Sequence, residues 1–109
     1  MTFLTVHLYV GFVVCALALF GVWRRPERRI TLYVVTLQLL LGIVLAARGL
    51  RVPPLHIGLA ILGWAGYMVA NALARRADRA RLALLIAGLS SLLILIAFAI
   101  GHGAVRSGA

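Results

Sequence analysis

The stretch LRVPPLHIGLA, residues 50–60, separates two long apolar segments and decides how the chain can fold. Two adjacent prolines, Pro53 and Pro54, interrupt any helix that precedes them. A new hydrophobic run follows at once, and its first polar residue is His56. An imidazole at the mouth of an apolar helix is costly unless another group satisfies it. The stretch therefore predicts a turn between two helices, and it raises the question of what His56 contacts.

Four apolar segments lie on either side of this turn, at about residues 3–23, 30–47, 55–74 and 82–101, and none contains a charged residue. Each has about the 20 residues that a helix needs to cross a hydrocarbon core of about 30 Å. The chain is 64% hydrophobic, which exceeds the usual content of soluble domains. We therefore predict one all-α domain, residues 1–109, with four transmembrane helices. The first segment lacks a basic leading region, so we expect a retained span rather than a signal peptide.

The arginines predict the orientation of these spans. Eight of them lie in the loops that follow the first and third spans, at residues 24–29 and 75–81, whereas only Arg48, Arg51 and Arg106 lie on the other side. By the positive-inside rule, both chain ends should face outward from the plasma (inner) membrane of a prokaryote. A net charge of +9 would suggest nucleic acid for a soluble chain. Here the arginines flank lipid-length segments, so contact with the lipid bilayer is the simpler explanation.

Short loops favour an up-down-up-down four-helix bundle, in which the first and third spans lie diagonally across the centre. Small residues recur at every fourth position on two of the spans, which favours close helix packing. They are Gly66, Ala70 and Ala74 in the third span, and Ala83, Ala87 and Ser91 in the fourth. The amides Gln38 and Asn71 should face the bundle interior, because an unsatisfied amide in lipid is costly.

All three histidines gather at the outer end of this bundle. His7 lies one turn into the first span, His56 opens the third, and His102 lies in a flexible-looking GHG run that closes the fourth. Each one taken alone is compatible with a half-solvated interfacial residue. His7 and His56 differ from His102, because they lie at similar depth on diagonal helices and can face each other across the core.

Two facing neutral imidazoles suit the axial positions of a haem iron. Small residues follow each histidine on the same helical face: Gly11 after His7, and Ala60 and Gly63 after His56. These faces would leave room for a flat haem b. Arg48 and Arg51, in the outer loop, are placed either to pair with haem propionates or to contact solvent and lipid headgroups. Zinc is the competing metal, with His102 as a weaker third ligand, but that side offers no carboxylate to orient the imidazoles.

Two motifs resemble the haem A synthase family. The run LQLLLGIVL, residues 37–45, precedes a short loop with prolines and then LHIGLA, residues 55–60. In that family a span carrying Leu-Gln-x-x-Leu-Gly precedes a span that opens on a haem-ligating histidine. The family has two tandem four-helix bundles, each using a histidine from its first and third helices. The resemblance implies a single such bundle here, with His7 and His56 as the ligands.

The chain departs from the family's pattern at two positions. In the catalytic half of the family, a glutamate precedes the first histidine by three residues and an arginine follows it, whereas this chain has Leu4 and Leu8 there. The resemblance therefore implies haem binding more than the family's oxidation chemistry, and we expect an electron carrier rather than a catalyst.

Three functions remain open from the sequence. The leading one is a small cytochrome b, or a haem-carrying accessory subunit of a membrane electron-transfer complex, with other subunits or a quinone as redox partners. The second is a haem-free structural subunit of a respiratory or photosynthetic complex. The third, a small multidrug-type transporter, is weaker because the first span lacks the embedded glutamate that such proteins use for proton coupling.

Overall fold

A computed structural model of the chain describes residues 2–21 and 25–106, with the side chains of residues 2–21 and 27–104. Its long elements are four α-helices: α1 (Phe3–Phe20), α2 (Arg25–Ala47), α3 (Pro54–Leu73) and α4 (Ala80–Arg106). One turn of 3₁₀-helix, η1 (Ala77–Arg79), precedes α4. All four α-helices are long and apolar enough to cross a membrane, which confirms the prediction of an all-helical chain with four such segments.

Local chemistry explains where α2 ends, where α3 begins after the loop between them, and where α1 begins. Gly49 has a φ of 94° and follows α2, in the left-handed conformation that commonly closes a helix. Pro53 and Pro54 then start α3, where the missing N–H of proline costs nothing and its fixed φ suits the first turn. At the N-terminus, the Thr2 side chain accepts a hydrogen bond of 3.1 Å from the backbone N–H of Thr5 and caps α1.

Two helices extend beyond the predicted apolar segments. α2 begins at Arg25 instead of residue 30, and α4 runs from Ala80 to Arg106, through the GHG run that the sequence suggested to be flexible. A helix does not end where hydrocarbon ends, because arginine is a good helix former and its long side chain reaches the polar interface. The predicted end of the first span at Trp23 lies outside the described residues.

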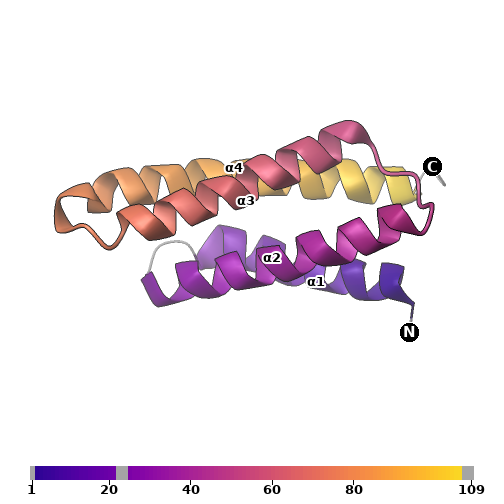
Figure 1. The fold of residues 1–109 in the computed structure, drawn as a ribbon, viewed down its shortest axis with the longest axis horizontal. Helices are drawn as coiled ribbons and strands as arrows, with labels where there is room; N and C mark the ends of the chain where they lie inside the picture. Colours follow the sequence, from indigo (N-terminus) through magenta and orange to yellow (C-terminus); the bar gives the residue numbers. More distant parts are fainter. Residues whose placement is uncertain (1, 22–24, 107–109) are drawn as a thin grey trace.

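Consecutive helices run in opposite directions, and the two chain ends lie at the same end of the bundle (Figure 1). α1 contacts α2 and α4, and α3 contacts α2 and α4, so α1 and α3 lie on a diagonal. α3 and α4 pack together most extensively, whereas contacts between the α1–α2 pair and the α3–α4 pair are sparser. The molecule is therefore two helical pairs laid together, 46 Å along its longest axis.

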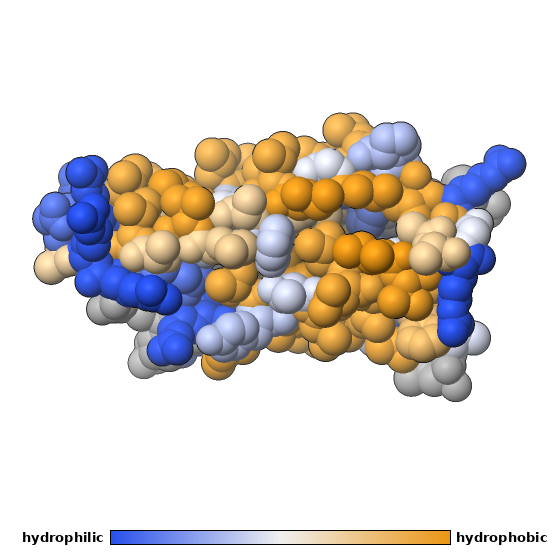
Figure 2. Space-filling model, viewed as in Figure 1, coloured by the Kyte–Doolittle hydropathy of each residue, from blue (hydrophilic) through white to orange (hydrophobic). Residues whose placement is uncertain are grey.

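Small side chains fill the tightest contact, between α3 and α4. Ala70, Ala83 and Ala87 are fully buried, and a Cβ at Gly66 would overlap the Ser90 hydroxyl. Close approach of small residues is how helices associate in lipid, as the fourfold spacing suggested. Large apolar side chains face outward instead, and Leu85 is 64% exposed. Figure 2 shows the resulting apolar middle with hydrophilic residues at both ends, as a membrane protein requires.

Candidate functional site

A cavity of about 170 Å³ lies between the two helical pairs, at the end of the bundle that holds the chain termini. All four α-helices and the loop between α2 and α3 contribute to its wall, which is mostly aliphatic. Five lining residues have side chains with nitrogen atoms: His7, Gln38, Arg51, His56 and His102. The cavity is thus apolar with a few polar groups, the usual character of a ligand or cofactor site.

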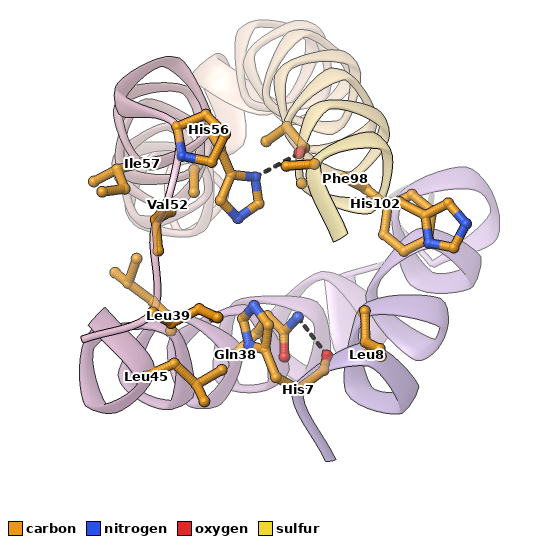
Figure 3. Close-up of a pocket in the computed structure, with 18 of the residues that line it drawn as sticks. His7, Leu8, Gln38, Leu39, Leu45, Val52, His56, Ile57, Phe98 and His102 are labelled. Atoms are coloured by element: carbon orange, nitrogen blue, oxygen red, sulfur yellow. Dashed lines mark hydrogen bonds between the residues drawn. The ribbon is translucent and has the colours of Figure 1, made fainter. Parts of the chain in front are cut away.

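His7 and His56 point into this cavity from opposite sides. His7 comes from α1 and His56 from α3, and Figure 3 shows their imidazoles facing each other across the gap between the helical pairs. The sequence predicted this arrangement from the similar depth of the two residues on diagonal helices, and the structure brings the two side chains together.

The ring of His56 is fixed by α4. Its Nδ1 lies 2.6 Å from the carbonyl oxygen of Ala97, and a neutral imidazole satisfies that contact when Nδ1 carries the proton and donates. The tautomer that makes this bond leaves Nε2 as an acceptor toward the cavity, as in metal-bound histidines. Gly101 makes room for the ring, since a Cβ there would lie 2.6 Å from Cε1 and 2.8 Å from Nδ1.

His7 is held by α2 in a related way. A Cβ at Gly42 would lie 3.3 Å from Cε1 of His7, so this glycine also accommodates an imidazole. Gln38 donates from Nε2 to the backbone carbonyl of His7 at 2.7 Å and joins the two helices. Among the described residues, no partner contacts the buried Nδ1 of His7 or the buried Oε1 of Gln38. Buried polar atoms in proteins usually have a hydrogen-bond partner, so these two atoms are the polar groups of the site that could accept one.

The two histidines therefore have matching environments in the two helical pairs. Each imidazole packs against a glycine on the next helix in the chain, Gly42 for His7 and Gly101 for His56. The residue four positions before each glycine also contacts the histidine, but in a different way: Gln38 donates from its side chain to the backbone carbonyl of His7, whereas the backbone carbonyl of Ala97 contacts Nδ1 of the His56 ring. The sequence analysis gave neither glycine a role beside a histidine, although Gly42 lies in the LQLLLGIVL motif. The signal that could have found them is the shared spacing of four residues on the helix that follows each histidine.

His102 does not join this pair. Its ring stacks on Phe98, with centroids 5.6 Å apart and planes 7° apart, and it makes an edge contact with Phe12 of α1. It lines the cavity but lies to the side of the gap between His7 and His56 (Figure 3). Within the described part of the chain, no three His, Cys, Asp or Glu side chains are grouped so that they could hold a metal. The three-histidine zinc site is therefore not formed.

The other predicted site residues divide between the cavity and its surroundings. Gly11 and Ala60 line it, and so does Arg51 at its outer end. Arg48 lies instead over the ring of Phe3, 4.4 Å from its centroid, which is a cation–π contact at the surface. Gly63 differs most from expectation. The space beside it is filled by Ile94, which a Cβ would approach to 2.7 Å, so Gly63 serves the packing of α3 on α4.

The donor set suits a bis-histidine haem by its chemistry, whereas the cavity is smaller than a porphyrin. Two imidazoles on diagonal helices, glycines that leave room for the rings, and an apolar wall are what axial ligation of a haem between helices needs. A porphyrin is larger than a cavity of about 170 Å³, so it enters only if the helical pairs separate at this end.

Comparisons of the chain with family models, with curated proteins and with solved structures found no match. The functional argument therefore depends on the geometry of the site itself.

Proposed function

We propose that this chain is an integral membrane protein that binds one haem b between His7 and His56 and transfers electrons in a membrane complex. The observation that carries the proposal is the pair of imidazoles facing each other across an apolar cavity, each packed against a glycine. The resemblance of residues 37–45 and 55–60 to haem A synthases points to the same two histidines. This proposal makes the chain the counterpart of one half of such a protein.

A haem held by two imidazoles would supply reversible one-electron chemistry at its iron. The residues of this chain contribute the rest. The carbonyl of Ala97 fixes the tautomer and orientation of His56, while Gln38 fixes α1 against α2 at the level of His7. The aliphatic wall excludes water, and Arg51 at the outer end of the cavity offers a guanidinium to a propionate. Because His7 and His56 would both hold the haem, the site would favour electron transfer over substrate oxidation.

The membrane placement is part of the same proposal. Eight arginines in the loops after the first and third spans, against three on the other side, support an orientation with both termini outside a prokaryotic plasma membrane. The haem would then lie near the outer leaflet, within reach of a periplasmic carrier, a quinol or a neighbouring subunit.

Haem content of purified variants tests the proposal. The wild type should yield about one haem b per chain, measured as the pyridine haemochrome, while His7→Ala and His56→Ala should each lose most of it. His102→Ala is the matched control, because it removes an imidazole that lines the cavity outside the facing pair. If the wild type carries no haem and all three variants accumulate equally, the chain is a haem-free structural subunit and the proposal is wrong.

A further inference from the structure

A second cavity, also of about 170 Å³, lies at the end of the bundle opposite the histidines. It is lined by Arg28, Arg29, Asn71, Ala74 and Arg75. Arg28 and Arg29 belong to the first turns of α2, and Arg75 follows the end of α3. Three of the five described residues that line it are therefore arginines from two different helical segments. Figure 2 shows hydrophilic surface gathered at this end of the molecule.

Asn71 explains why these arginines come together. Its Nδ2 donates to the carbonyl oxygen of Tyr67 at 2.8 Å and, over 3.4 Å, to the carbonyl oxygen of Arg28. The second contact joins the last turn of α3 to the first turns of α2. Arg28 is 7% exposed, whereas Arg29 and Arg75 are exposed. One guanidinium is thus held inside the bundle, and two more stand at the rim of the cavity.

The charged side chains of this cavity are of one kind. Among the described residues that line it are three arginines and no carboxylate. The two acids of the chain, Glu27 and Asp78, lie close in sequence but outside the lining, and the Asp78 carboxylate lies 3.9 Å from Nε of Arg79. The guanidinium groups of Arg29 and Arg75 at the rim of the cavity carry like charges, and an anion bound between them reduces their repulsion.

We propose that this cavity binds a phosphate group, supplied by the headgroup of an anionic phospholipid. The planar guanidinium matches phosphate oxygens with two parallel hydrogen bonds, so arginine is the residue best suited to hold this group. The cavity lies where α3 leaves its apolar segment and the arginine loop begins, which is the level of lipid headgroups. Basic cavities between transmembrane helices on the arginine-rich side bind anionic lipids in the same manner.

Native mass spectrometry of the full chain in a neutral detergent tests the site. The probes are dioleoyl phosphatidylglycerol, dioleoyl phosphatidylcholine and inorganic phosphate. Arg29→Gln and Arg75→Gln each remove one exposed guanidinium from the cavity, so both should fold. Arg81→Gln is the matched control, because it removes the same charge from an exposed residue at the same end of the bundle, outside the cavity lining.

Phosphatidylglycerol should bind the wild type and Arg81→Gln with equal affinity, and about tenfold more weakly to Arg29→Gln and Arg75→Gln, the effect of losing a charge-assisted hydrogen bond. Competition by inorganic phosphate shows that the phosphate group alone occupies the site. A lack of competition shows that the lipid chains are needed, and both results support the proposal if the cavity variants weaken binding. Equal binding to all variants, or phosphatidylcholine binding as tightly as phosphatidylglycerol, overturns it.

Discussion

Replacing Gly101 with alanine perturbs the histidine site through a single added carbon. The new Cβ would lie 2.6 Å from Cε1, 2.8 Å from Nδ1 and 3.1 Å from Nε2 of His56. The first two distances are shorter than non-bonded contacts allow, so the imidazole must turn away. That rotation lengthens or breaks the 2.6 Å contact between Nδ1 and the Ala97 carbonyl.

The size of the effect follows from comparison with Gly103→Ala, which lies two residues further along α4 in open space. Alanine favours a helix over glycine by about 0.5–1 kcal/mol, and both variants gain this amount. Gly101→Ala also loses a hydrogen bond worth about 0.5–1.5 kcal/mol and strains a side-chain rotamer by about 0.5–1.5 kcal/mol. The free energies of unfolding of the two variants should therefore differ by about 1–3 kcal/mol.

Unfolding of both variants in mixed micelles of a mild detergent and dodecyl sulfate, followed by circular dichroism, measures this difference. Gly101→Ala should be the less stable variant, and it should also hold less haem than Gly103→Ala. Equal stabilisation of both variants would refute the reasoning, because it would mean that the ring of His56 does not pack against Gly101.

Two further predictions concern parts of the molecule outside the histidine pair. Tyr67→Phe removes a hydroxyl that lies 2.7 Å from Oγ of Ser91 in the fully buried contact between α3 and α4. The free energy of unfolding of this variant, measured in the same titration, should be about 1 kcal/mol lower than that of the wild type, and the variant should keep its haem. An unchanged free energy of unfolding would mean that the hydrogen bond contributes nothing to stability. In a Cys15→Ala background, Arg76→Cys places a single thiol in an arginine loop, and a membrane-impermeant maleimide should label it in inverted vesicles only. Labelling in intact cells would mean that the chain has the opposite orientation to the one that the arginines predict.

The four spans follow from the sequence because hydrophobic length and charge exclusion are properties of the chain alone. The ends of the helices do not follow from the sequence. α2 begins at Arg25 and α4 continues past His102, outside the apolar segments, where hydropathy gives no signal. The facing histidines also follow from the sequence. In a four-helix bundle, residues at the same depth on neighbouring or diagonal helices lie close together, so their proximity can be predicted once the arrangement of the helices is known.

The surroundings of the two histidines required the three-dimensional structure. Ala60 and Gly63 lie on the face of α3 that carries His56, yet only Ala60 reaches the cavity. Gly63 lies about 10 Å further along the axis of α3 than His56, because each helical residue rises about 1.5 Å. At that level Ile94 fills the space beside α3. The positions of Gly42 and Gly101 against the imidazoles depend on the rotation of α2 and α4 about their axes, which a single sequence does not specify.

The most direct test of the central claim is electron paramagnetic resonance of the oxidised, purified protein. Iron held by His7 and His56 should give the low-spin ferric signal of two imidazole ligands, and His56→Ala should convert it to a high-spin signal or remove it. A wild-type protein with high-spin iron, or with no haem signal at all, would contradict the account.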